Sequence, residues 1–334
     1  MKNEETAVPL RANRFGLSVA LATPFAEDRS IDLPRLVAHA GQSLADGCTS
    51  VTVFGTTGEG ASLGQNDRQR ALGALVGAGI DPRTQLVVGI AASSVEDAIA
   101  QGRAGLMLGC PSFLLAPPFY FKGAGDEGLF DWIAAVLTGL GPKASNVILY
   151  HIPQVTAVGL SMELVDRLKK AFPGQVTGVK DSSGDWNNAQ ALLQQHGDLH
   201  ILIGDERLLA RAMTLGASGA ITGLANIAPD LMLPLIDGIE EPRVNAMVEL
   251  VLPYAVTAAV KALVGLRRND PLAWSRMRAP LASLGESDVR KLGAAIDAIR
   301  SRCAAWRRGR ATPAARSSCV ADEDAPLEWR APSE

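Results

Sequence analysis

Lys180 stands at the end of a short apolar run, residues 176–179, and is followed directly by turn-forming residues at 181–184. Such a run predicts a buried parallel strand, in which long charged side chains are rarely tolerated. A lysine at the carboxyl end of that strand would lie at the rim of a pocket, partly removed from water. Desolvation disfavours the ammonium form and leaves an amine that can form a Schiff base with a carbonyl substrate. Taken alone, Lys180 is better explained as an ordinary strand-end lysine whose stem reaches water.

Two further apolar runs also end in polar groups: one leads into Gly55, Thr56 and Thr57, and another into Tyr150. The first supplies hydroxyls and backbone amides that can hold an anion, and the phenol could relay a proton near an amine. Each has an ordinary alternative, a tight turn with local threonine hydrogen bonds or a half-buried aromatic residue at a barrel rim. All of them together with Lys180, at three strand ends, are better explained as one site.

Strand and helix patterns alternate between residue 17 and about residue 238. The predicted strands are 17–22, 50–54, 85–90, 112–116, 147–150, 176–180, 199–203 and 217–222. The predicted helices between them are 33–45, 66–77, 95–107, 127–138, 162–172, 187–196 and 207–215. Eight such units predict an α/β fold, a (β/α)8 TIM barrel, in which the carboxyl ends of the strands meet at one mouth. A doubly wound open sheet is the alternative, but no GxGxxG motif follows the first strand.

The sequence divides into four segments. Residues 1–14 predict a flexible N-terminus, residues 15–240 the barrel, and residues 241–306 a C-terminal helical extension with helices at 242–266, 271–284 and 287–305. In residues 307–334, arginines alternate with Ala, Pro and Ser before an acidic end, which predicts a disordered tail. The basic part of this tail could bind an anion, although a solvated tail is the stronger interpretation.

Composition narrows the functional classes. A chain of 334 residues with 47% hydrophobic content can bury a large core, and the net charge of −3 does not favour binding to nucleic acid or an anionic membrane. No apolar stretch is long enough to span a bilayer, and the apolar run at 17–21 is too short for a signal peptide. The four cysteines lack CxxC spacing and the four histidines lack HExxH spacing. We therefore expect a cytoplasmic protein without a metal site or a cofactor.

Five motifs carry a resemblance to a known family. In chain order they are GTTGE at 55–59, PFY at 118–120, YHIP at 150–153, GVKDSSG at 178–184 and GDE at 204–206. At this spacing the chain resembles the dihydrodipicolinate synthase and N-acetylneuraminate lyase family of pyruvate-binding class I aldolases, from Phe15 to about Cys303. The resemblance implies a TIM barrel with a helical extension, usually a homotetramer built as a dimer of dimers. The implied substrates are pyruvate or another 2-oxo acid, together with an aldehyde co-substrate.

The resemblance also implies roles for four residues in the chemistry. Lys180 forms the Schiff base, Tyr150 relays protons, and Thr56 links Tyr150 to Tyr120 of a neighbouring subunit. An iminium makes the 2-oxo acid an electron sink, so a carbon–carbon bond can be made or broken through an enamine without a metal.

Five other positions are implied in substrate binding. Thr57, with the backbone amides of the turn that begins at Gly55, holds the substrate carboxylate, and the carbonyl oxygen of Ile221 lines the same pocket. Asp205 and Glu206 match an acidic pair that lyases of the family use on sugar hydroxyls. Capping of a helix N-terminus explains this pair equally well.

The chain departs from the synthase pattern at two places. Val155 occupies the position of the arginine that binds the aldehyde carboxylate in the synthases, and no valine rotamer can imitate a guanidinium. His151 or Arg207 could fill the vacant role. The lysine-binding regulatory site also looks absent, because the matching positions hold Gln65, Arg68, Ser93, Asp97 and Phe119.

These features favour an aldolase, lyase or dehydratase acting on a 2-oxo acid, for which a 2-oxo-3-deoxy sugar acid is one candidate. The first alternative is 4-hydroxy-tetrahydrodipicolinate synthase of lysine biosynthesis. A phosphate-handling barrel enzyme is a second, although only Gly204, Gly223 and Arg207 would support a phosphate site. A non-catalytic regulator on the same fold is a third, and an unreactive Lys180 would favour it.

Overall fold

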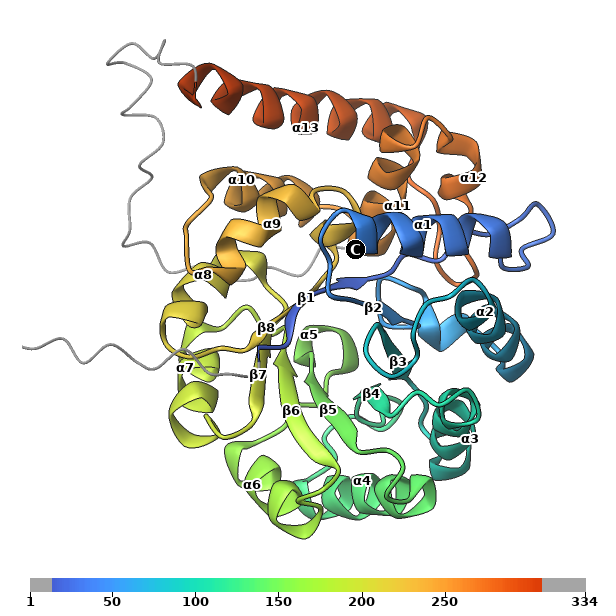
Figure 1. Ribbon diagram of the computed structural model, residues 1–334, viewed down its shortest axis with the longest axis vertical. Helices are drawn as coiled ribbons and strands as arrows, with labels where there is room; N and C mark the ends of the chain where they lie inside the picture. Colours follow the sequence, from blue (N-terminus) through green and yellow to red (C-terminus); the bar gives the residue numbers. More distant parts are fainter. Residues whose placement is uncertain (1–13, 308–334) are drawn as a thin grey trace, which may run out of the picture.

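The computed structural model describes residues 14–307, and its centre is a closed barrel of eight parallel strands (Figure 1). Each strand pairs with its neighbours in chain order, and β8 closes the barrel on β1. The strands are β1 Gly16–Ala20, β2 Ser50–Val53, β3 Leu86–Ile90, β4 Ser112–Leu115, β5 Asn146–His151, β6 Val176–Asp181, β7 His200–Ile203 and β8 Gly219–Thr222. The predicted TIM barrel is confirmed, and the strand ends differ from prediction by at most two residues.

Helices connect the strands and surround the barrel (Figure 1). They are α1 Leu33–Ala45, α2 Gln65–Gly77, α3 Val95–Leu106, α4 Asp126–Leu140, α6 Met162–Ala171, α7 Trp186–Gln195 and α8 Glu206–Thr214. Several begin where a side chain accepts a hydrogen bond from the first turn, as Ser94 does in α3 and Ser161 in α6. Two short helices were not predicted, α5 Pro153–Thr156 and α9 Pro229–Ile236. Pro229 occupies the first helical position of α9, where the missing N–H of proline costs no helical hydrogen bond.

The apolar side chains form two clusters on opposite sides of the sheet. The larger cluster lies between strands and helices and includes Val147 and Leu149 of β5, whereas the smaller cluster fills the barrel and includes Ile148 and Tyr150. Residues of β5 alternate between the two clusters because successive side chains of a strand point to opposite faces of the sheet. Because the barrel interior is filled by side chains, polar groups of the site are confined to its ends.

One extra residue in β6 interrupts this alternation of inward-facing and outward-facing side chains. Val147 pairs with Val176, but the next residue of β5, Ile148, pairs with Gly178, so Thr177 is an extra residue in β6. Beyond this bulge Tyr150 and Lys180 are paired in register. Lys180 therefore faces the barrel interior with Tyr150, and not the surrounding helices.

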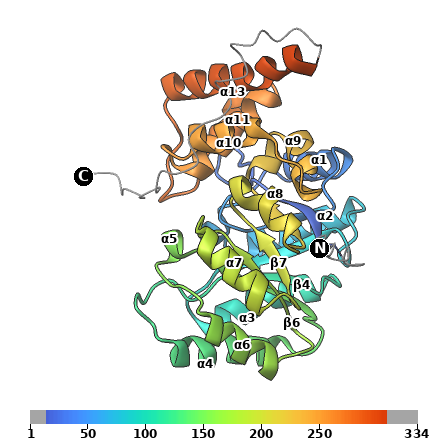
Figure 2. The same ribbon diagram turned by 90° about the vertical axis from the view of Figure 1, so that its left-hand side faces the viewer.

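The C-terminal extension lies on one side of the barrel, with α10 and α11 between the barrel and α13 (Figures 1 and 2). Its helices are α10 Pro242–Val251, α11 Val256–Arg267, α12 Pro271–Ser275 and α13 Glu286–Arg307. The prediction of one helix over 242–266 is wrong, because the chain breaks at 252–255, where Pro253 cannot continue the backbone hydrogen bonds. The helix predicted at 271–284 ends at Ser275, and the non-helical segment after it approaches the barrel mouth. The helix predicted at 287–305 is confirmed as α13.

Except for Arg14 and Arg307, the predicted flexible N-terminus and disordered tail lie outside the described residues. Within residues 14–307, no single helix is long and apolar enough to cross a membrane. Together α10 and α11 reach the required length and composition, but only as a pair bent by 117°.

Candidate active site

Lys180 and Tyr150 form the centre of the candidate site. The Lys180 Nζ donates a hydrogen bond to the Tyr150 hydroxyl at 3.1 Å and lies 4.2 Å from the centre of the phenol ring. Both side chains are buried, each with 5% of its surface exposed. An amine held against a phenol in a desolvated place can react with a carbonyl group and exchange protons with its neighbour.

Tyr150 has an electrostatic environment that favours its ionised form. Burial alone would raise the pKa of the Tyr150 hydroxyl, but the charge of Lys180 and hydrogen bonds with Thr56, Lys180 and Ser182 together lower it. Thr56 was predicted as a partner of Tyr150, whereas Ser182 was not assigned any role. A Cβ on Gly204 would lie 1.9 Å from the Ser182 Oγ, so glycine at 204 leaves the space for this side chain. A lowered pKa makes the phenolate of Tyr150 more available as a proton acceptor than in free tyrosine.

The glycine-rich loop after β2 is held in a strained conformation. Phe54 and Glu59 both have positive φ values, 60° and 55°, which bulky residues seldom adopt. A Cβ on Gly60 would lie 1.8 Å from the Phe54 carbonyl oxygen, so only glycine allows the loop to close this tightly. Backbone strain of this kind persists only when surrounding contacts fix it, and it is common where ligands are held.

The structure brings the predicted carboxylate-binding residues to the same end of the barrel. Thr57 lies beside the end of β8, because a Cβ on Gly223 would be 3.4 Å from its Oγ1. Ile221 is fully buried in β8, within the cluster that fills the barrel and also contains Tyr150. Gly55 lines a cavity next to Tyr150. Thr57, which follows β2, and Ile221 of β8 thus lie on the two sides of β1.

The cavity beside Tyr150 has a volume of about 450 Å³ and a mostly apolar wall. Ile90, Leu114, Phe119, Ile152 and Val155 contribute to it, and Val155 is more than half exposed. In the part of the chain that the structure describes, this wall contains one carboxylate and no lysine, arginine or histidine. The cavity can therefore enclose a carbon-rich group beside Tyr150, but its described wall presents no cation to a carboxylate.

Tyr120 is not brought to the site of its own chain. Its side chain is 72% exposed and packs edge-on against Phe121, which is also exposed. An exposed pair of aromatic side chains on a loop is unusual for a surface that meets only water. The expectation that Tyr120 reaches a neighbouring subunit remains a prediction.

Asp205 and Glu206 are both engaged within the fold. Asp205 caps α8 by accepting from the Arg207 backbone N–H, and its carboxylate also pairs with the Arg207 guanidinium at 2.7 Å. Glu206 is buried and accepts hydrogen bonds from the Thr222 hydroxyl and the Leu224 N–H. Burial raises the pKa of Glu206, and Asp205 adds to this effect. The capping interpretation of Asp205 is observed directly, and neither carboxylate lines the apolar cavity.

The two basic residues considered as substitutes for the missing arginine also have structural partners. The His151 Nδ1 accepts a hydrogen bond from the Leu160 N–H at 3.0 Å, and burial lowers the pKa of its imidazole. Arg207 is held by Asp205. Lys122, which no sequence motif marked, donates to the carbonyl oxygens of Phe119 and Thr156 and lies outside the cavity wall.

Residues of the extension that were not predicted hold the glycine-rich loop. Lys261 of α11 forms an ion pair with Glu59 at 2.6 Å, and both side chains are completely buried. The other carboxylate oxygen of Glu59 accepts the Arg278 N–H, and the Thr257 hydroxyl donates to the Thr56 carbonyl oxygen at 3.3 Å. The sequence gives one indication of this ion pair: a single lysine within the apolar sequence of α11 requires a buried partner. The extension is therefore part of the site.

No group of three or more histidine, cysteine, aspartate or glutamate side chains within residues 14–307 could hold a metal ion.

Among the positions matched to a regulatory site, Arg68 is fully buried and its guanidinium donates to the carbonyl oxygens of Gly60 and Gly89. It therefore supports the base of the glycine-rich loop.

Comparison with known proteins agrees with this architecture. Residues 13–299 match the profile of the Dihydrodipicolinate synthetase family. The chain belongs to this family. Among its relatives, an "Uncharacterized DapA-like lyase" of Chloroflexus aurantiacus is 34% identical over 294 residues, covering 85% of this chain and 96% of the relative.

Solved structures of other proteins have the same fold. A dihydrodipicolinate synthase from Agrobacterium tumefaciens str. C58 is 48% identical, with a TM-score of 0.83 and coverage of 86% of this chain and 99% of that one. An N-acetylneuraminate lyase from Proteus mirabilis is 24% identical, with a TM-score of 0.75 and coverage of 85% and 98%. The second likeness concerns the fold alone. Synthases and lyases thus share this scaffold, so the reaction must be inferred from side chains.

Proposed function

We propose that the protein is a Schiff-base-forming lyase or aldolase that acts on pyruvate or a larger 2-oxo acid. The observation that carries this proposal is the buried contact between the Lys180 amine and the Tyr150 hydroxyl. Membership of a family that contains lyases and synthases supports the same chemistry. The amine adds to the 2-oxo carbon, and loss of water gives an iminium on Lys180.

In the cleavage direction, the hydroxyl on C4 of the bound substrate loses its proton to the Tyr150 phenolate. The electrons of the C3–C4 bond then move toward the iminium, which releases an aldehyde and leaves an enamine. The enamine takes a proton back at C3, and water releases pyruvate and restores the amine of Lys180. Tyr150 suits the acceptor role because its lowered pKa makes the phenolate more available than in free tyrosine. Thr57 and the amides of the loop from Gly55 would hold the substrate carboxylate.

We further propose that the part of the substrate distant from the carboxylate is uncharged. Among residues 14–307, the cavity wall beside Tyr150 is mostly apolar and offers no cation, and Val155 contributes to it. A neutral or hydroxylated tail fits such a wall, whereas a second carboxylate would lose its hydration without gaining a partner. A sugar acid would depend on Asp205 or Glu206 for hydroxyl contacts, and these carboxylates would have to change partners.

Synthesis of 4-hydroxy-tetrahydrodipicolinate is the second candidate, because a relative named dihydrodipicolinate synthase is 48% identical. The cavity wall argues against it, since the aldehyde of that reaction carries its own carboxylate. A non-catalytic role on this fold would require an unreactive Lys180.

Borohydride reduction in the presence of pyruvate tests the proposal. A covalent adduct is expected on the peptide that contains Lys180, and Lys180→Arg should abolish both adduct and turnover, because a guanidinium does not form the imine. An adduct on Lys261, which is also buried, would overturn the assignment, and no adduct at all would support the non-catalytic alternative. A panel of 2-oxo-3-deoxy acids with neutral tails, assayed for pyruvate release, would then identify the substrate.

A further inference from the structure

The extra residue in β6 decides which way Lys180 faces. Val176 belongs to the cluster outside the barrel, and in a regular strand Lys180, four positions later, would face the same side. The bulge at Thr177 reverses the facing of every later residue in the strand. Val179 accordingly packs in the outer cluster, and Lys180 pairs with Tyr150 inside the barrel.

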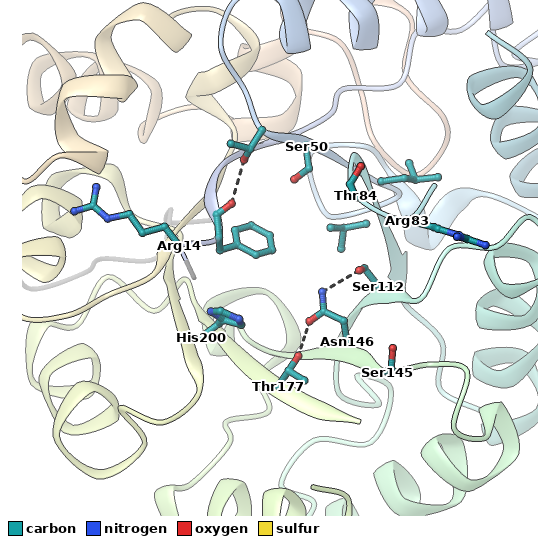
Figure 3. A pocket seen from close by; sticks show the side chains of 13 residues that line it. Arg14, Ser50, Arg83, Thr84, Ser112, Ser145, Asn146, Thr177 and His200 are labelled. Carbon is teal, nitrogen blue, oxygen red and sulfur yellow. Dashed lines mark hydrogen bonds between the residues drawn. The ribbon is translucent and has the colours of Figure 1, made fainter. Parts of the chain in front are cut away.

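A chain of hydrogen bonds ties the bulge to two neighbouring strands (Figure 3). The Thr177 hydroxyl donates to the Asn146 Oδ1, and the Asn146 Nδ2 donates to the Ser112 hydroxyl at 2.9 Å. Asn146 and Ser112 are the first residues of β5 and β4 and are paired in register. The network therefore spans β4, β5 and β6 at the end of the barrel opposite the reactive amine.

The surroundings of the network suit a positioning role better than ligand binding. The side chains line a cavity of about 420 Å³ at the amino ends of the strands. Figure 3 shows the guanidinium groups of Arg14 and Arg83 directed away from its centre. Arg14 is bound to Asp237 at 3.1 Å, so it offers no free charge to a ligand.

The residue after the bulge is also fixed tightly. A Cβ on Gly178 would lie 2.8 Å from the His200 carbonyl oxygen, so β6 and β7 approach closely at this point. If β6 shifted by one position along β7 to absorb the extra residue Thr177, a residue with a side chain would replace Gly178 at this close contact. The hydroxyl network and the glycine thus hold the same local geometry from two sides.

We propose that Thr177 and Asn146 are positioning residues for Lys180, which hold the β6 bulge and so turn the amine toward Tyr150. The catalytic consequence rests on the proposed function of Lys180, whereas the geometric consequence does not. Without the network, β6 would relax toward regular pairing, in which Lys180 turns toward the helices and Val179 toward the barrel interior.

The variants Thr177→Val and Asn146→Ala test this inference with two readouts. The first readout is the rate of borohydride trapping with saturating pyruvate, expected to fall roughly 10- to 100-fold because a displacement of about 1 Å has effects of this size. The second is the tyrosinate absorbance on alkaline titration, which reports Tyr150 without any turnover. Because Lys180 helps to lower the pKa of Tyr150, the early tyrosinate signal should move to higher pH in both variants.

Two controls separate positioning from general loss of stability. Thr177→Ser keeps the donor hydroxyl and should restore both readouts. Thr52→Val removes a buried hydroxyl that is 2.8 Å from the Ser18 hydroxyl in another part of the barrel, and it should change neither readout. Lower thermal stability of Thr177→Val with unchanged trapping and unchanged Tyr150 titration would overturn the inference. If the wild-type protein is not trapped at all, the proposed function fails, and the Tyr150 titration still decides the role of the bulge.

Discussion

Lys180 and Tyr150 occupy paired positions on β6 and β5, and the amine of one lies 3.1 Å from the hydroxyl of the other. Burial alone would raise the pKa of Tyr150, but the charge of Lys180 and the hydrogen bonds around the phenol together lower it. Under the proposed function, the amine that forms the Schiff base and the phenol that accepts a proton are thus in contact before any substrate arrives.

Removal of the Tyr150 hydroxyl should affect turnover far more than folding. Tyr150→Phe keeps the ring that packs inside the barrel, so thermal unfolding should change little. Turnover should fall by roughly 10²–10⁴-fold, the usual contribution of a positioned acid or base. Steady-state kinetics on a neutral-tailed 2-oxo acid measure the effect. Near-normal turnover would show that another group, such as Ser182, handles the proton.

Tyr120 is expected to act in the site of a neighbouring subunit. Its side chain is exposed in the single chain, and the hydroxyl of Tyr120 is therefore available to a partner. Tyr120→Phe should lower turnover, and mixing this variant with inactive Lys180→Arg subunits should restore part of the activity in mixed oligomers. Sedimentation at decreasing concentration supplies the companion measurement. A monomer with full specific activity would remove this assignment.

The buried ion pair between Lys261 and Glu59 should support substrate binding by the loop. Lys261→Met leaves the Glu59 carboxylate buried without its partner, which typically costs about 3–5 kcal/mol of unfolding free energy. If the pair also holds Thr56 and Thr57 in place, the KM for pyruvate should rise more than kcat falls. Val264→Ala, a cavity-forming change on the same buried helix, is the matched control and should lower stability without changing KM. Equal kinetic effects in both variants would make the ion pair merely structural.

The barrel and the proximity of Lys180 to Tyr150 could be predicted from the sequence, because strand-end residues are recognisable locally. Lys180 and Tyr150 each follow a short apolar run, and a parallel barrel necessarily gathers such ends at one mouth. The bulge at Thr177 was not predictable, because nothing in the apolar run distinguishes a regular strand from one with an extra residue. The Glu59–Lys261 pair joins residues 202 positions apart, so no local pattern connects them.

His39, which lies where α1 meets the extension, should make the free energy of unfolding depend on pH. Its imidazole is buried on α1, with Nε2 donating to the Asn226 Oδ1 and Nδ1 accepting from Arg268 of the extension. Burial lowers the pKa of His39 from 6.5 to about 4, so the native state disfavours the protonated ring. Its contribution is complete above pH 6.5 and is lost as the pH falls through about 4, on the order of 3 kcal/mol in total.

Denaturant unfolding of the wild type and His39→Gln at several pH values measures this contribution. The carboxylates titrate alike in both proteins, so the difference between the two stabilities isolates His39. That difference should shrink as the pH falls from 6.5 to 4. A constant difference across this window would contradict the assignment of a neutral, buried imidazole.

Val155 should limit the use of an aldehyde that carries a carboxylate. A charged hydrogen bond of the kind an arginine provides is worth about 1.5–3 kcal/mol, so its absence should lower catalytic efficiency toward aspartate semialdehyde on the order of 10- to 150-fold. Val155 is more than half exposed on the cavity wall, so a longer side chain has room to extend. Val155→Arg should therefore raise efficiency with aspartate semialdehyde and lower it with a neutral-tailed substrate. Val155→Met, of similar reach but without charge, is the matched control. The prediction would be contradicted if the wild-type efficiency toward aspartate semialdehyde equalled that of lysine-pathway synthases. In that case, loss of this activity in Lys122→Met would show that Lys122 binds the aldehyde carboxylate in place of the arginine.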